Sequence, residues 1–176
     1  MNATSTVHAE MPLLSNAPLG EVTPAADGSV EVVFHRHYKA SPDRVWAALT
    51  TPERLADWFA EAKVDLRVGG TLSLDWGGTN QADMRITVCD PPKTFAWVWH
   101  LGGRDTLVQF DLTPEAGGCA LTLTHSGITS ASGGVRRGWH AHLEAIPDAL
   151  EGRATPWAIK TDREDAIAPS YPKLVD

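Results

Sequence analysis

The chain has 176 residues, of which 43% are apolar and 21% are charged, close to the averages of globular proteins. This length fits one domain with room for terminal segments and excludes most multidomain enzymes. The 15 basic and 22 acidic residues give a net charge of −7 at pH 7, the wrong sign for holding nucleic-acid phosphates. We therefore expect no nucleic-acid partner.

Targeting signals and cysteine motifs are not evident. No apolar run approaches the roughly 20 residues that a membrane-spanning helix requires, and the first 28 residues contain no Lys or Arg to begin a secretory signal. Cys89 and Cys119 are too few for a disulfide framework and lack the spacing of a zinc or redox motif. We expect no membrane span and a cytoplasmic location.

Composition divides the chain into three parts. Residues 1–28 mix small residues and prolines with three acids and no base, which indicates a flexible leader. Residues 153–176 carry three prolines and balanced charge, and are predicted to form a C-terminal tail docked by Trp157. The segment 29–152 remains as the folded, ligand-binding domain.

The first half of this domain alternates strand and helix signals. Residues 30–40 predict a long strand, because β-branched and aromatic residues share one parity. Ser41-Pro42 and Thr51-Pro52 each place a hydroxyl residue before a proline, which predicts two short helices. Six strand-like runs follow, separated by turns rich in Gly, Pro or Asn. They span residues 63–68, 71–76, 82–89, 94–100, 106–114 and 119–127.

Residues 134–152 predict one long closing helix. Trp139, Leu143, Ile146 and Leu150 fall on a single helical stripe, and Pro147 is expected to kink the helix. The resulting fold class is α+β, with two short helices after the first strand. A curved antiparallel sheet of about seven strands surrounds the long C-terminal helix.

A curved sheet that grips one helix leaves a gap between the two layers, and pockets of this kind bind ligands. The side chains expected to face the gap are rich in aromatic rings, which favour a hydrophobic, aromatic or polycyclic guest. Core packing and ligand contact both remain open as roles for these rings. The predicted ligand contacts are Tyr38, Trp58, Phe59, Trp97, Trp99, Val108, Phe110, Leu123, His125, Trp139 and Leu143.

His125 is the polar residue of most interest, because its parity with Leu121 and Leu123 directs it towards the gap. There it could orient a ligand hydroxyl or transfer a proton, which makes it a weak candidate for a catalytic residue. The alternative is a structural histidine bonded to a backbone carbonyl near the end of its strand. Arg36 has two similar alternatives, binding of an acidic ligand group or a structural ion pair.

The remaining motifs carry no specific chemistry. His140 and His142 are two residues apart on the predicted helix, so they cannot share a metal ion as an i, i+4 pair could. No carboxylate or cysteine at ligand spacing joins His35 and His37. The glycine doublets lack a phosphate-binding context and predict turns. We expect no metal site and no cofactor.

Four segments resemble one protein family in the order of its signatures: HYKASPDRVWAALTTPERLADWF, DPPKTFAWVW, LTLTHSG and GWHAHLEAIPDALEG. Together they are similar to the single-domain branch related to the activator of the 90-kDa heat-shock protein's ATPase, within the START-like (SRPBCC) superfamily. The resemblance covers about residues 30–152 and implies a helix-grip fold. It also implies a breadth of roles, because superfamily members carry lipids, hormones or polyketides, and some relatives cyclise, dehydrate or hydroxylate their ligands.

Three functions are consistent with these observations. The favoured one is binding of a hydrophobic, aromatic small molecule between the sheet and the closing helix. The second is a cofactor-independent cyclase or dehydratase that acts on a polyketide-like or aromatic substrate through His125. The third is an interaction module like the chaperone ATPase activators, and a homodimer is left open. Fold alone does not decide among them.

Overall fold

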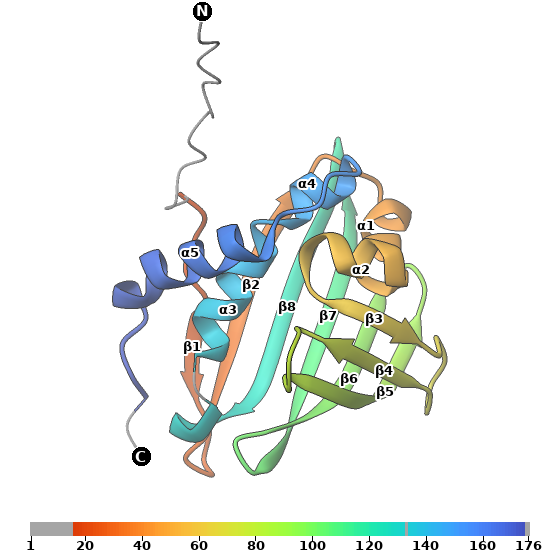
Figure 1. Ribbon diagram of the computed structural model, residues 1–176. Helices are drawn as coiled ribbons and strands as arrows, with labels where there is room; N and C mark the ends of the chain where they lie inside the picture. Colours follow the sequence, from red (N-terminus) through yellow and green to blue (C-terminus); the bar gives the residue numbers. More distant parts are fainter. Residues whose placement is uncertain (1–15, 133, 175–176) are drawn as a thin grey trace, which may run out of the picture.

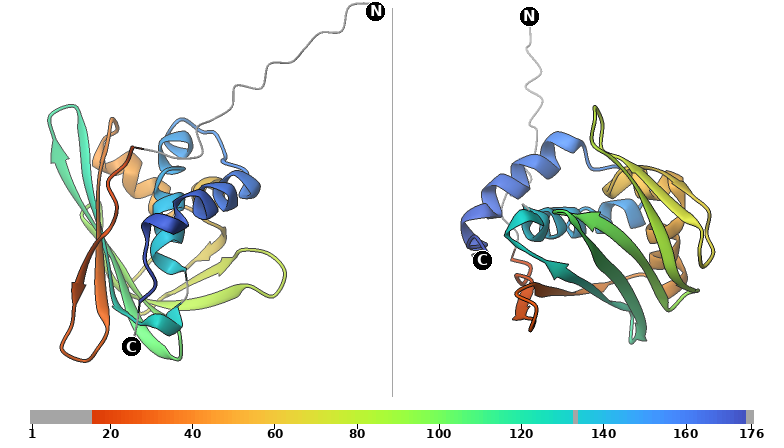
Figure 2. Two further views of the ribbon diagram at one scale, coloured as in Figure 1. Left: turned by 90° about the vertical axis from the view of Figure 1, so that its left-hand side faces the viewer. Right: turned by 90° about the horizontal axis from the view of Figure 1, so that it is seen from below.

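The computed structural model describes residues 16–132 and 134–174. Its eight antiparallel strands form one curved sheet in the order β1-β2-β8-β7-β6-β5-β4-β3, and the sheet wraps around α3 (Figures 1 and 2). The strands are β1 (Glu21–Pro24), β2 (Val30–Tyr38), β3 (Glu61–Val64), β4 (Thr71–Asp75), β5 (Gln81–Asp90), β6 (Thr94–Leu101), β7 (Arg104–Glu115) and β8 (Gly118–Ile128). This arrangement confirms the α+β helix-grip fold, with eight strands in place of about seven.

Five α-helices accompany the sheet among the described residues. They are α1 (Pro42–Thr50), α2 (Pro52–Trp58), α3 (Val135–Leu143), α4 (Ile146–Leu150) and α5 (Trp157–Ile167), with short 3₁₀ turns η1 (Ser130–Ser132) and η2 (Ala168–Ser170). The first two begin at the predicted prolines. Ser41 caps α1 by accepting a hydrogen bond from the Arg44 amide at 3.4 Å, whereas Thr51 makes no side-chain cap. For α2 the fixed φ of Pro52 at the first turn is the remaining start signal.

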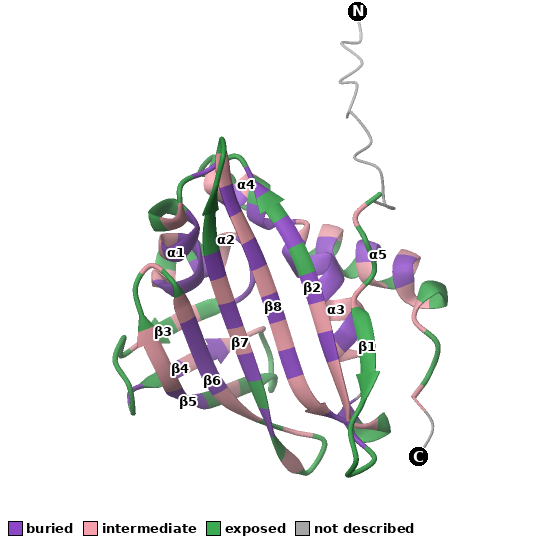
Figure 3. Cartoon of the chain, turned by 180° about the vertical axis from the view of Figure 1, so that it is seen from behind, coloured by how far each residue is buried: buried purple, intermediate pink, exposed green. Residues whose placement is uncertain are grey.

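The concave face of the sheet is built by alternation of buried and more exposed residues along the central strands β7 and β8. In β8 the residues Cys119, Leu121, Leu123 and His125 are buried and their neighbours are partly exposed, a pattern visible from behind (Figure 3). Cross-strand pairing carries this face from strand to strand, because Val32 and Val108 both pair with His125. His125 therefore lies in an apolar row on the inner face of the sheet.

The structure divides the predicted closing helix into α3 and α4. Pro147 has no N–H to donate to the Leu143 carbonyl, and its ring clashes with a helical carbonyl in that position. The Tyr38 hydroxyl donates to the Leu143 carbonyl instead, at 3.3 Å. Burial raises the pKa of Tyr38 well above its usual value, so the hydroxyl keeps the proton that it donates. A strand residue thus caps the end of α3.

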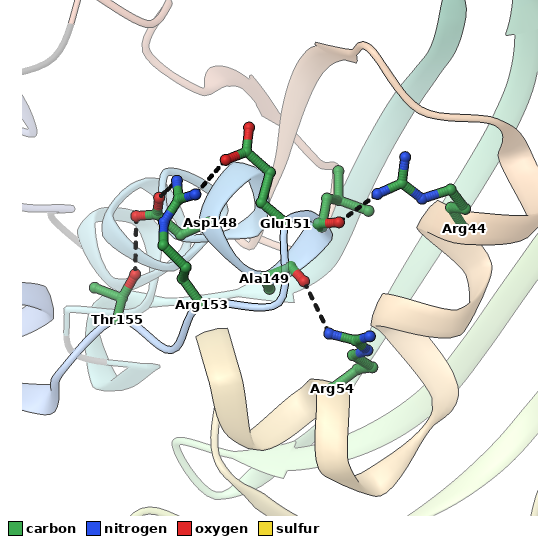
Figure 4. Close-up of polar contacts among 8 residues, drawn as sticks. Arg44, Arg54, Asp148, Ala149, Glu151, Arg153 and Thr155 are labelled. Carbon is green, nitrogen blue, oxygen red and sulfur yellow. Dashed lines mark hydrogen bonds and ion pairs between the residues drawn. The ribbon is translucent and has the colours of Figure 1, made fainter.

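Arginines of α1 and α2 hold the end of α4 (Figure 4). Arg44 donates to the carbonyl of Leu150, and Arg54 donates to that of Ala149 at 3.3 Å. Cations are favourable at a helix C-terminus because of the unpaired carbonyls there. Arg153, just beyond α4, pairs with Asp148 at 2.5 Å. These contacts turn the chain towards α5.

Both terminal segments contribute regular structure that the sequence did not predict. β1 lies within the predicted leader and adds an edge strand to β2, while α5 and η2 lie within the predicted tail. α5 crosses α3 on the side away from the sheet (Figures 1 and 2). Trp157 begins α5 but is 49% exposed, and the helix buries Lys160, Arg163 and Ile167. Residues 1–15 of the predicted leader lie outside the described part.

The first of the six predicted strand runs is displaced. β3 ends at Val64, and residues 65–70 form a turn closed by bonds from the Arg67 amide to Asp65 and from the Gly70 amide to Arg67. Val68, expected within a strand, is 62% exposed. No helix in the described residues has both the length and the apolarity to cross a membrane.

Replacing Tyr38 with Phe should lower the free energy of unfolding by about 1–2 kcal/mol, because the buried Leu143 carbonyl loses its donor. Urea denaturation measures this loss. In a Pro147→Ala background the backbone gains an N–H at position 147 that can bond the same carbonyl, so the loss caused by Tyr38→Phe should shrink. Equal losses in both backgrounds would contradict the assigned capping role.

Candidate ligand-binding cavity

A cavity of about 270 Å³ lies between the sheet and α3, at the rim where α5 passes. Its walls come from the end of α2, the connection between β4 and β5, the end of β6, the segment before α3, α3 itself, and α5. The lining residues are Phe59, Trp76, Asn80, Trp99, Leu101, Ser132, Gly134, Val135, Gly138, Trp139, His142, Trp157 and Glu164. Aromatic rings dominate this set.

Two aromatic stacks form the inner wall. In the first, the Trp99 ring lies between His125 and Trp76, with centroid distances of 5.8 and 5.6 Å and interplanar angles of 12° and 7°. This stack leads from the buried interior to the cavity rim. Its nearly parallel planes are a preferred geometry for aromatic neighbours.

The second stack places Phe59 between Trp58 and Trp139, at 5.0 and 5.1 Å. It meets the first at almost a right angle, since Phe59 and Trp76 are inclined by 83° and Trp99 and Trp139 also by 83°. Edge-to-face contacts of this kind are favourable and restrict ring rotation. The wall is therefore a rigid aromatic surface.

His125 connects this wall to the backbone of the sheet through three hydrogen bonds. The Trp139 indole N–H donates to His125 Nδ1 at 2.9 Å, so Nδ1 carries no proton. His125 Nε2 is then the protonated nitrogen and donates to Thr106 Oγ1 at 2.8 Å. Thr106 in turn donates to the Trp99 carbonyl at 2.8 Å. The chain of bonds fixes both the tautomer and the ring orientation.

Burial lowers the pKa of His125 to about 3, so the ring is neutral at neutral pH. Its side chain is fully buried, and both nitrogens are bonded to protein groups. Neither nitrogen of His125 is therefore free to act as the acid or base that the sequence suggested. The geometry instead gives His125 a structural role, with side-chain partners rather than the backbone carbonyl expected.

His142 and Lys160 converge on the end of α2. His142 Nδ1 lies 3.0 Å from the Trp58 carbonyl, and Lys160 Nζ donates to the same oxygen at 3.2 Å and to the Phe59 carbonyl at 3.4 Å. Burial lowers the pKa of His142 to about 4 and that of Lys160 to about 8. Because Nδ1 of the neutral His142 ring donates, Nε2 carries a lone pair, and it has no hydrogen-bond partner within the described chain.

Three of the predicted ligand contacts line the cavity: Phe59, Trp99 and Trp139. The other eight are packed in the core and do not line it. Trp58, for example, donates its indole N–H to the Ala48 carbonyl at 2.8 Å, and Trp97 packs between Phe95 and Phe110. These eight buried residues are Tyr38, Trp58, Trp97, Val108, Phe110, Leu123, His125 and Leu143.

Sequence reasoning missed Trp76, His142 and Trp157 as lining residues. Trp76 shares the strand parity of Leu72 and Leu74, which was an available signal for the inner face. His142 follows Trp139 by three residues, which places both on one side of a helix. Trp157 lies beyond the predicted domain, and no local pattern places it at the cavity.

Arg36 does not reach this cavity. Its side chain is buried on the other side of α3, where Nη1 donates to the His35 carbonyl at 2.8 Å and the guanidinium lies 5.4 Å from the Phe34 ring centroid. Desolvation lowers the pKa of Arg36, while the charge of Glu144 acts in the opposite direction. His140 also faces this side, as the predicted divergence from His142 requires. No group of three metal-ligating side chains occurs in the described residues.

A curved antiparallel sheet that grips a helix beside an aromatic cavity defines the helix-grip, START-like class of ligand-binding domain. Residues 39–151 match the family described as "Activator of Hsp90 ATPase homolog 1-like protein", and the chain belongs to this family. No curated protein matches the sequence.

Solved structures similar to this chain agree with that assignment. The crystal structure of CalU16 from Micromonospora echinospora is 28% identical over 85% of this chain and 94% of that one, with a TM-score of 0.64. The crystal structure of MLL2253 from Mesorhizobium loti is 27% identical over 71% and 99%, with a TM-score of 0.63. The solution structure of the Aha1 dimer from Colwellia psychrerythraea is 26% identical over 69% and 96%, with a TM-score of 0.62.

The two buried histidines predict a loss of stability at mildly acidic pH. Their folded pKa values of about 3 and about 4 lie below the unfolded value of about 6.5, so the unfolded chain binds protons more readily. Their contribution is complete above pH 6.5 and is lost as the pH falls towards the folded values. Between pH 7 and pH 5 the free energy of unfolding should fall by about 1–2 kcal/mol per ring.

Urea denaturation at several pH values measures this slope. His125→Asn, which cannot titrate, should reduce the slope, whereas His35→Asn on the exposed face of β2 serves as the matched control. An unchanged slope in His125→Asn would show that this ring is not buried in its neutral form.

Proposed function

We propose that this protein binds a planar aromatic small molecule of two or three fused rings in the cavity between the sheet and α3. The observation that carries the proposal is the rigid wall of two crossed aromatic stacks, which ends at the rim with Trp76. A cavity of about 270 Å³ is close to the lower end of ligand pockets, about 300 Å³, and suits a compact guest.

Ring chemistry supports an aromatic guest over a flexible chain. Trp76, Trp99 and Trp139 hold one another in fixed orientations, so a flat ligand meets surfaces that need no reordering. Aromatic pairs in offset or edge-to-face contact contribute about 0.5–1.5 kcal/mol beyond their buried area. A flexible acyl chain would lose its own rotational freedom without this gain.

His142 supports a hydroxyl on the guest. Its Nε2 lone pair belongs to a ring that lines the cavity, while Nδ1 fixes the ring to the Trp58 carbonyl. A ligand O–H can donate to Nε2, and few other polar side chains line the walls. The proposed ligand is therefore a hydroxylated aromatic compound.

The same histidines favour binding over catalysis. A general base works best when its pKa lies near the operating pH, and the pKa of His142 is about 4. His125 is committed to Trp139 and Thr106. The cyclase or dehydratase alternative thus lacks a well-matched proton carrier among the residues predicted for it.

Trp76→Ala should weaken binding of 2-naphthol at least tenfold, because the ligand loses the outermost ring of the stack. Isothermal titration calorimetry measures the affinity without depending on tryptophan emission. Leu107→Ala, on the convex face of β7, is the control and should leave the affinity unchanged. Equal affinities for wild type and Trp76→Ala, or no binding across 2-naphthol and hydroxylated anthraquinones, would reject the proposal.

His142→Phe should weaken binding of 2-naphthol but not of its O-methyl ether, which has no hydroxyl hydrogen to donate. The variant keeps an aromatic ring, and Lys160 still donates to the Trp58 carbonyl, so the fold is expected to persist. Calorimetry of the wild type and of His142→Phe, each with the two ligands, gives the coupling energy between the His142 ring and the ligand hydroxyl. An equal loss for both ligands would assign His142 a packing role only.

A further inference from the structure

A second cavity, of about 380 Å³, lies on the other side of the start of α3, against the C-terminal segment. Three cations line it: Arg136 and Arg137 from the first turn of α3, and Lys173 from the C-terminal segment. Thr129 and Ser130 add hydroxyl groups, whereas the Tyr171 hydroxyl is bonded to the Gly20 amide and to His140, both at 2.9 Å. None of its described lining residues is Asp or Glu, although acids outnumber bases by 22 to 15 in the whole chain.

Arg136 is the innermost of these cations, with 8% of its surface exposed. Its Nη2 donates to the Pro172 carbonyl, and its guanidinium lies 5.8 Å from the Tyr171 ring centroid. It takes part in none of the ion pairs found among the described residues, and burial lowers its pKa. A buried cation with no counter-ion among the described residues is costly, so an anion placed beside it would be stabilising.

Arg137 lies over Gly134 at the edge of the same cavity. A Cβ at position 134 would lie 2.7 Å from Arg137 Nε, so glycine leaves the space that the guanidinium occupies. Glu164 contacts Arg137 through Nε at 2.9 Å and leaves the Nη groups outside that bond. Lys173 is exposed and forms no ion pair within the described residues. Arg137 and Lys173 therefore provide further N–H donors at this cavity.

We infer that this cavity binds an oxyanion, the phosphate or carboxylate group of a small molecule. Guanidinium groups form short, charge-assisted and often paired hydrogen bonds with both groups. The hydroxyls of Thr129 and Ser130 supply neutral polar groups beside the arginines. The two cavities share Gly134 but no other lining residue, and the cations lie only in the second, so this inference does not depend on the proposed aromatic ligand.

Titration with inorganic phosphate and, separately, with acetate tests the inference at constant ionic strength maintained with KCl. Amide chemical shifts of the full chain provide the readout. At least one oxyanion should produce saturable shifts confined to the residues around the start of α3 and the C-terminal segment. The phosphate and acetate series distinguish the two classes of ligand.

Arg136→Gln should weaken the binding at least tenfold. Because Arg136 is buried, the double variant Arg137→Gln/Lys173→Gln, whose side chains are partly or fully exposed, provides a second test with the same expected loss. Lys39→Gln, an exposed cation beyond the end of β2, is the control that matches Arg136→Gln in charge, and it should bind as the wild type does. The inference is overturned if neither oxyanion saturates, if KCl alone reproduces the shifts, or if the double variant binds as well as Lys39→Gln.

Discussion

The hydrogen bond between Trp139 and His125 couples the two layers of this fold, and much of the cavity depends on it. A buried imidazole needs partners for both nitrogens, and the sheet supplies only one of them, through Thr106. The second partner is the Trp139 indole of α3, so this hydrogen bond fixes the position of the helix along the sheet. In this position of α3 the Trp139 ring packs against Phe59 and Trp99. A single polar requirement thus orders two aromatic stacks.

The break at Pro147 determines what covers the cavity rim. Because α3 ends at Leu143 under the Tyr38 hydroxyl, the chain turns into α4 and reaches the arginines of α1 and α2. It then returns as α5 across α3 (Figure 2). Lys160 of α5 and His142 of α3 meet at the Trp58 carbonyl, which brings Trp157 to the cavity. The rim is therefore held largely by polar contacts, while the wall behind it is held by ring packing.

The sequence predicts the inner face of the sheet well because strand alternation is local. The parity of Leu121, Leu123 and His125 is enough to direct these residues inward, and prolines mark the starts of α1 and α2. It does not predict which inward residues meet empty space. Trp97 and Trp99 share one parity, yet the first packs between phenylalanines and the second lines the cavity. That difference arises from contacts among distant segments.

The same distinction explains where ligand selectivity can reside in this fold. Most of the gap expected between sheet and helix is filled by the crossed stacks, so the space left for a guest lies at the rim. The rim is formed by Trp76 and Asn80 near a hairpin, His142 on α3, and Trp157 on α5. Substitutions there change the surface offered to a ligand without disturbing the His125 hydrogen bonds. A helix-grip domain can therefore keep its core and still alter its guest, because the two depend on different residues.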